Sequence, residues 1–267
     1  MRPGGKMSNA RLAELVSALE SELLDFMERH QVNHDEYRAA TDLIVSSIKQ
    51  GEESLLFDVF FEARATDTGN VDREGSPEAI EGPFYVPNAP FLPAPSVMPQ
   101  RPNEAGVILF FTGEVRDAKG NPISEMEIDL WHADAEGLYS NIHPGIPDFN
   151  LRGRFNTDSD GKFEVKTILP PPYEIPKSGP TGYVLSQLGR HFFRPAHLHM
   201  KLRHPNHVEM TSQLYFAGGD YLKNDVANAV REGLIGVFSY VDDPAEIARR
   251  GLSDPFYVYR YDFTLPS

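Results

Sequence analysis

The first part of the chain places apolar residues at helical spacing. Residues 8–65 are predicted to be helical, and in their first part gaps of three, one, three, four, one and three positions separate Leu12, Leu15, Val16, Leu19, Leu23, Leu24 and Met27. Ser8 or Asn9 can cap the start of such a helix. Similar patterns predict a second helix over about 34–49 and a third over about 52–65. The chain has no proline between Pro3 and Pro77, as long helices require.

The pattern changes at Ser76, and from about Val107 it consists of short predicted strands separated by turn signals. VILFFTGEV and MEIDLWHA flank the turn DAKGNPI, and KFEVKTI follows the turn DSDG. HLHMKLRH, SQLYFAG and FYVYRYDFTL are further predicted strands, and residues 242–250 are a predicted short helix. The sequence therefore predicts a mainly β fold, in which a β-sandwich domain over 76–267 follows an N-terminal α-helical region over 1–75.

The helical region has too little chain to bury both faces of its helices. We expect it to pack on a second subunit and to form a homodimer, with packing against its own sandwich as the alternative.

Composition narrows the functions that this fold could carry. The 267-residue chain has a net charge of −14, which disfavours binding to nucleic acid or to an anionic membrane surface. It has no run of 18 apolar residues and no signal-like start, so we expect a cytoplasmic protein without a membrane span. Residues 1–6 resemble a leader or expression-derived sequence, and Met7 is an alternative start. Because cysteine is absent, any metal must be held by nitrogen and oxygen.

The segment RPAHLHMKL contains a pair of histidines at strand spacing. Side chains alternate faces along a strand, so His197 and His199 point the same way and can converge on one ion. The alternative is a pair of hydrogen-bonded strand histidines without a metal. The remaining histidines lack a convincing second partner, and we expect them to be structural or exposed.

Two tyrosines lie in contexts that suit a metal ligand. Tyr139 follows a predicted strand and a glycine, and Tyr173 lies in LPPPYEIP, where prolines restrict the backbone on both sides. A coordinated phenol ionises readily, and two phenolates favour a trivalent cation. The alternative for each tyrosine alone is a packed aromatic ring.

Taken together, these segments resemble the intradiol ring-cleavage dioxygenases, and most closely the catechol 1,2-dioxygenase group. The matching stretches include IEGPFYVPNAP, DLWHADAEGLYS, PPPYEIPKSGPTG, LGRHFFRPAHLHMKL and TSQLYFAGGDYL. The resemblance implies one non-haem Fe(III) per subunit, held by Tyr139, Tyr173, His197 and His199. It also implies that Arg194 stabilises negative charge on the substrate, that Gln213 supports the metal site, and that Tyr173 leaves the metal when substrate binds.

The implied reaction is cleavage of a small aromatic diol by O2 to a cis,cis-muconate, in aromatic compound catabolism. The resemblance implies a substrate pocket formed by Leu55, Asp58, Val59, Ile80, Pro83, Phe84 and Ala227. It favours catechol, with hydroxyquinol and chlorocatechols as alternatives, and it allows a lipid at the helical dimer interface. A non-enzymatic β-sandwich binding module is the alternative from another class, but it leaves RPAHLH and the proline-rich Tyr173 segment unexplained.

Overall fold

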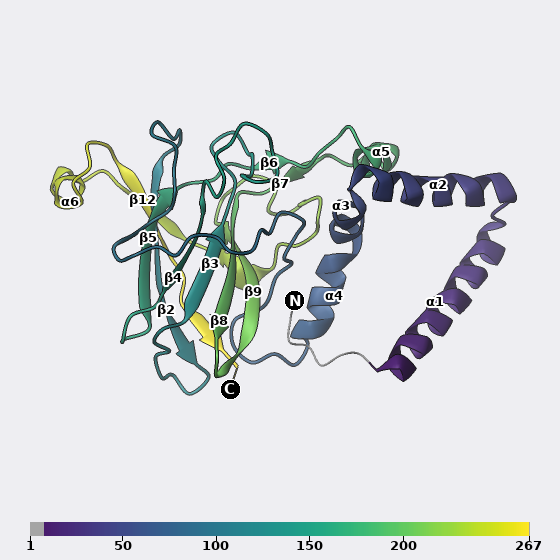
Figure 1. Cartoon of the computed structure of the whole chain (residues 1–267), viewed down its shortest axis with the longest axis horizontal. Helices are drawn as coiled ribbons and strands as arrows, with labels where there is room; N and C mark the ends of the chain where they lie inside the picture. The colour runs from purple at the N-terminus through teal and green to yellow at the C-terminus, as the bar shows by residue number, and fades with distance from the viewer. Residues whose placement is uncertain (1–7, 267) are drawn as a thin grey trace. The chain divides into compact units, whose positions relative to one another are not determined.

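The computed structural model describes residues 8–266, and the chain divides into two compact units after Glu53. The N-terminal unit consists mainly of two helices, α1 (Asn9–His30) and α2 (His34–Gln50) (Figure 1). The Ser8 side chain accepts a hydrogen bond from the Arg11 amide at the start of α1, as the sequence predicts. Asn33 and Glu36 form a capping box at the start of α2. The predictions about residues 1–6 and Met7 lie outside the described residues.

The second unit contains two β-sheets that form the predicted sandwich. The first sheet follows the order β1 (Ser96–Val97), β5 (Lys162–Ile168), β2 (Ile108–Asp117), β12 (Phe256–Arg260), β11 (Phe238–Val241), and β13 (Phe263–Leu265) also pairs with β2. The second follows the order β10 (Ile235–Gly236), β9 (His207–Phe216), β8 (His197–His204), β3 (Glu127–Trp131), β4 (Arg152–Asn156). The mainly β fold is therefore confirmed, although the run FYVYRYDFTL forms two strands rather than one.

Alternation along the strands decides which side chains enter the core. Leu198, Met200 and Leu202 of β8 belong to the main hydrophobic cluster, together with Ile128 and Leu130 of β3. The intervening residues of β8 therefore point to the other face of the sheet. His197 and His199 are among them, so the strand that builds the core also directs both imidazoles away from it.

The third predicted helix is interrupted. It consists of α3 (Glu53–Phe57), a π-helical turn η1 (Asp58–Glu62) and α4 (Ala63–Asn70). Leu55 and Val59 pack in a cluster with Phe84 and Tyr139 of the β-rich unit. This packing explains why the compact units divide after Glu53, whereas the assignment of residues 1–75 to one dimerisation region remains a prediction.

Shorter elements complete the second unit. They are β6 (Tyr173–Glu174), α5 (Pro180–Gln187), β7 (Phe193–Arg194), the 3-10 turn η2 (Glu232–Leu234) and α6 (Pro244–Arg249). The last of these is the short late helix that the sequence predicts. Among the described residues, no helix combines the length and the apolar character needed to cross a membrane.

Candidate active site

The structure brings the four predicted metal ligands together in the second unit. The ring centroids of Tyr139 and Tyr173 are 5.4 Å apart, and those of Tyr173 and His197 are 5.6 Å apart. The His197 and His199 rings are 4.5 Å apart, and Tyr139 lies 6.0 Å from His199. All four side chains are buried. Residues separated by up to 60 positions thus form one cluster.

A tight turn after β3 places Tyr139. The Asp134 carboxylate accepts hydrogen bonds from the Glu136 and Leu138 amides, both at 3.0 Å, and so closes the turn. Gly137 has φ +81° in this turn, and a Cβ atom there would lie 2.6 Å from the Cβ of Tyr173. Only glycine therefore allows the two tyrosine-bearing segments to approach this closely.

A two-stranded ribbon places Tyr173. Tyr173 of β6 pairs with Arg194 of β7 in antiparallel register, and β7 leads directly into the strand that carries both histidines. The segment rich in proline thus brings its tyrosine beside RPAHLH, although the two motifs are separated in the sequence by helix α5.

Each histidine keeps one nitrogen for the centre of the cluster. The Nδ1–H of His197 donates to the Pro195 carbonyl at 2.7 Å, which leaves Nε2 without a proton in the neutral ring. Nε2 lies 2.9 Å from the Nε2 of His199. Burial, reinforced by Arg194, lowers the pKa of His197 to about 3. Burial and the neighbouring His197 also lower the pKa of His199 well below its usual value. Neutral imidazoles of this kind are metal ligands.

The possible metal donors in this cluster are tyrosine oxygens and histidine nitrogens. This set suits a highly charged cation, and it differs from a site built on carboxylates. Within residues 8–266, no group of three or more His, Asp or Glu side chains is placed to hold a metal ion. A metal held in this cluster would therefore draw on the tyrosine oxygens beside the histidine nitrogens. The buried Tyr139 hydroxyl has no well-formed hydrogen bond in the described part of the chain, although Tyr173 lies close enough to influence its ionisation.

The pKa values of the two tyrosines support the same conclusion. Burial raises the pKa of Tyr139 well above 10, and the nearby Tyr173 raises it further. Burial also raises the pKa of Tyr173, although Arg194 opposes the shift. Neither phenol would ionise in this environment alone, so phenolate here requires a strongly charged cation at the oxygen.

A small cavity opens beside the cluster. It is small, with about 330 Å³ of space between atoms that includes open solvent. All seven residues of the predicted substrate pocket line it: Leu55, Asp58, Val59, Ile80, Pro83, Phe84 and Ala227. Tyr173, Arg194 and His199 also line it, so the predicted ligands and the cavity form one continuous site.

Known proteins share both this chain's sequence pattern and its fold. A family model described as Dioxygenase matches residues 80–267, which include all four predicted ligands. The chlorocatechol 1,2-dioxygenase of Rhodococcus opacus is 38% identical over 243 residues, covering 90% of this chain and 95% of that protein. The chain belongs to the intradiol dioxygenase family. It is an oxidoreductase of the type that cleaves aromatic rings, which excludes the non-enzymatic module.

Other comparisons agree with this assignment. The catechol 1,2-dioxygenase of Acinetobacter baylyi is 33% identical over 266 residues, covering 96% of this chain and 86% of that protein. The crystal structure of 3-chlorocatechol 1,2-dioxygenase from Rhodococcus opacus 1CP has a TM-score of 0.89 at 37% identity. That comparison covers 97% of this chain and 100% of the other.

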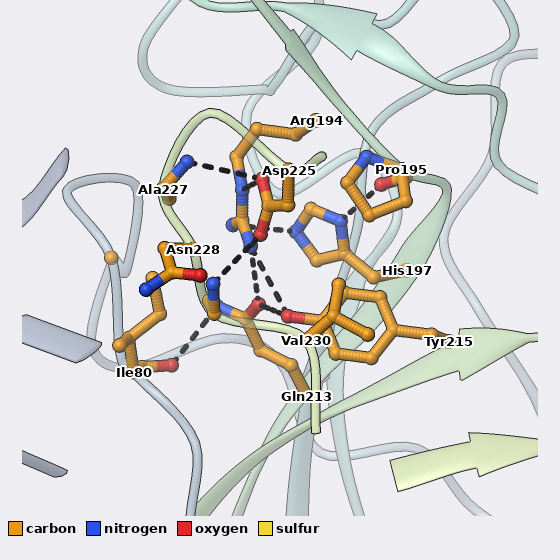
Figure 2. Close-up of polar contacts among 12 residues, drawn as sticks. Ile80, Arg194, Pro195, His197, Gln213, Tyr215, Asp225, Ala227, Asn228 and Val230 are labelled. Atoms are coloured by element: carbon orange, nitrogen blue, oxygen red, sulfur yellow. Dashed lines mark hydrogen bonds and ion pairs between the residues drawn. The ribbon is translucent and has the colours of Figure 1, made fainter. Parts of the chain in front are cut away.

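The intradiol dioxygenase contains a buried polar network around Arg194 that the sequence predicts only in part (Figure 2). Gln213, a predicted member of the site, accepts from Arg194 Nη2 at 2.9 Å and donates to the Ile80 carbonyl at 3.0 Å. Asp225 and Tyr215 also contact Arg194 but are not predicted. Strand spacing could have indicated Tyr215, which faces His197 in the register of β8 and β9. Asp225 lies in an irregular loop, where no periodic pattern marks it.

Proposed function

We propose that this intradiol dioxygenase cleaves catechol, with O2 as co-substrate, to cis,cis-muconate at one non-haem Fe(III) per subunit. The observation that carries the proposal is the convergence of two buried tyrosines and two neutral histidines beside a small cavity that the predicted substrate-binding residues line. Tyr139, Tyr173, His197 and His199 would hold the ion. The family uses non-haem iron, and two phenolates neutralise most of the charge of its oxidised form.

When bound, Fe(III) supplies Lewis acidity to the diol and makes its ring reactive towards O2. The residues of the chain then have separate tasks. Tyr139, His197 and His199 would hold the ion, whereas Tyr173 would also take up a proton from a substrate hydroxyl. Arg194 lines the cavity and carries a positive charge that balances the negative charge of the ionised diol.

The walls of the cavity support a catechol with small or no substituents. Leu55, Val59 and Ile80 provide apolar contacts. One methylene group in such a pocket changes the free-energy difference between two competing substrates by only about 1–3 kcal/mol. Chlorocatechols and hydroxyquinol are therefore the alternatives, and relatives named for chlorocatechol and for catechol are both similar to this chain.

We further propose a cytoplasmic homodimer that assembles through the N-terminal helices, with room for a lipid at that interface. Helix α1 buries none of its side chains within the described chain, and its leucines are exposed. An apolar stripe of this length normally requires a partner. Light scattering should give twice the mass of the chain, and mass spectrometry of an organic extract should detect any bound lipid.

Colour and substrate consumption test the proposed reaction. Purified protein with one iron per chain should be burgundy red, because phenolate donates charge to Fe(III) in the visible range. Oxygen uptake and ring-opened product should be measured side by side for catechol, methylcatechols, chlorocatechols and hydroxyquinol. A colourless protein with full iron content would contradict the ligand set. If chlorocatechol or hydroxyquinol is turned over faster than catechol, that compound is the preferred substrate in place of catechol.

A further inference from the structure

The side chain of Arg194 is buried and almost fully occupied. Its Nε donates to Asp225 Oδ1 at 3.1 Å, and its Nη2 lies within hydrogen-bond distance of Asp225, Gln213 and Tyr215. Nη1 differs from the other two nitrogens, because its partner in the described chain is Nε2 of His197, at 3.2 Å. The guanidinium is planar, so fixing Nε and Nη2 also fixes the direction of Nη1.

Both oxygens of Asp225 are shared between Arg194 and a loop (Figure 2). Oδ1 accepts from Arg194 Nε at 3.1 Å and from the Ala227 amide at 3.2 Å. Oδ2 accepts from Arg194 Nη2 at 3.0 Å and from the Ala229 amide at 3.0 Å. Ala227 lines the cavity, as does Arg194, whereas Asp225 does not. The Asp225 carboxylate therefore links Arg194, the cationic group of the site, to Ala227 in the cavity wall.

The electrostatics show that Asp225 is a charged partner. Burial alone would raise the pKa of Asp225, but Arg194 and the amides of Ala227 and Ala229 outweigh burial and lower the pKa. Burial would lower the pKa of Arg194, but Asp225, together with Tyr215 and Tyr173, outweighs it and raises the pKa. Removing one member of such a pair leaves an uncompensated buried charge, and the remaining group then moves or recruits water.

We propose that Asp225 is a positioning residue for catalysis, which aims the Nη1 group of Arg194 at the bound diol and holds the Ala227 side of the cavity. This inference rests on the proposed function, since it assigns Asp225 an effect on the reaction rather than on the metal. Asp225 does not line the cavity, and its hydrogen bonds go to Arg194, Ala227 and Ala229 rather than to the four ligands. Its loss should therefore leave iron binding intact and slow the conversion of bound substrate.

The first test compares Asp225→Asn with a matched control. Asp67→Asn removes one carboxylate from another Asp–Arg pair, which lies away from the four ligands. In that pair, Asp67 accepts hydrogen bonds from Arg231 at 2.6 and 2.8 Å. Asp225→Asn should keep iron content and the charge-transfer band, while kcat for catechol falls roughly a hundredfold, the scale expected when one aligned donor is lost. Asp67→Asn should keep kcat within about twofold of wild type.

The second test asks whether Asp225 acts through Arg194. Arg194→Gln and the double variant Arg194→Gln/Asp225→Asn should have kcat values within about twofold of each other, because the group that Asp225 orients is already absent. The double variant has no uncompensated buried charge at Arg194. It can therefore still be compared with Arg194→Gln if Asp225→Asn alone does not fold. Anaerobic titration with catechol, followed in the charge-transfer band, gives the same comparison for substrate binding without turnover.

The outcomes separate this proposal from the proposed function. A colourless or inactive wild-type protein would overturn the proposed function and, with it, this inference. With a red and active wild type, unchanged kcat in Asp225→Asn would overturn the role of Asp225 alone. So would loss of iron in that variant, or a further hundredfold loss when Asp225→Asn is added to Arg194→Gln.

Discussion

The cavity has two walls that are built in different ways, and we call them the strand wall and the helix wall. The strand wall consists of Tyr173, Arg194 and His199, which lie on β6, β7 and β8 and are fixed by strand pairing. The helix wall lies on α3, the π-helical turn η1 and the segment that follows α4, and it consists of Leu55, Asp58, Val59, Ile80, Pro83 and Phe84.

The two walls also differ in their ionisable groups. Arg194 provides a buried cation on the strand wall, where its hydrogen-bond partners are numerous. On the helix wall, burial raises the pKa of Asp58 to about 7, and the charges of Glu62 and Glu81 raise it as well. The comparison indicates a division of labour. Under the proposed function, strand register holds the groups that would perform the reaction, while a helix with a π-helical turn, a common feature of functional sites, would contact the substrate ring.

The largest effect should follow from removing a ligand. Loss of a group that only supports a ligand lowers activity about 10–100-fold. Tyr139→Phe removes the predicted ligand oxygen itself, so it should reduce catechol turnover by roughly a thousandfold or more. It should also bleach most of the charge-transfer colour. Tyr240→Phe removes an exposed hydroxyl and is the control. Normal colour and rate in Tyr139→Phe would show that the ligand assignment is wrong.

A smaller effect should follow from disturbing the contact between the two tyrosine segments. In Gly137→Ala the added methyl group would meet the Cβ of Tyr173 at 2.6 Å, so one tyrosine must move. We expect turnover to fall about tenfold to a hundredfold, since misplacing a reacting group by about 1 Å costs that much. Gly145→Ala is a matched control, because Gly145 has φ +84° with nothing within 4 Å of its Cβ position. Equal losses in both variants would attribute the effect to backbone strain alone.

The residues of the site also show how much of it the sequence predicts. His197 and His199 could be paired from strand periodicity, because alternation alone places both on one face. Tyr139 and Tyr173 needed the family resemblance, since their segments meet through the long-range contact at Gly137. The role of Asp225 needed the structure, because an irregular loop brings its carboxylate to Arg194.

The helix wall was also predicted only in part. Helical periodicity indicated a helix over about 52–65, but the π-helical turn at Asp58–Glu62 has no signal in that pattern. Its register is stabilised by tertiary contacts, in which Glu62 accepts from the amides of Glu81 and Gly82. Sequence periodicity reports local preference, so it cannot detect an element that depends on a partner some 20 residues away.

The third prediction concerns Asp58 and the pH dependence of stability. The folded-state pKa of about 7 lies above the unfolded value of 3.8, so the bound proton stabilises the fold fully below pH 3.8. That stability is lost as the pH rises to about 7. Asp58→Asn removes this dependence and should gain roughly 1 kcal/mol relative to wild type between pH 5 and pH 8, after allowance for solvent screening.

Urea unfolding at pH 5 and pH 8 measures this change, with Asp42→Asn on α2 as the exposed control. An identical stability difference between Asp58→Asn and wild type at the two pH values would mean that Asp58 does not titrate in this range.

The smallest effect should come from Glu62, which supports the helix wall without lining the cavity. Its carboxylate accepts from the Glu81 amide at 2.8 Å and from the Gly82 amide at 3.2 Å, and so ties η1 to the segment that carries Pro83 and Phe84. Glu62→Gln keeps one acceptor oxygen but loses the charge and the second acceptor. A hydrogen bond of about 1 kcal/mol corresponds to roughly fivefold in binding, so KM for catechol should rise three- to fivefold with kcat nearly unchanged.

Glu62→Gln should also bring the pKa of Asp58 closer to its ordinary value, because the charge of Glu62 helps to raise it. The pH dependence of KM measures both effects in one series, and Glu246→Gln, at a half-exposed position on α6, is the control. A fall in kcat without a change in KM would contradict the distinction between the walls. It would mean that the helix wall also positions the reacting groups, which this structure assigns to the strands.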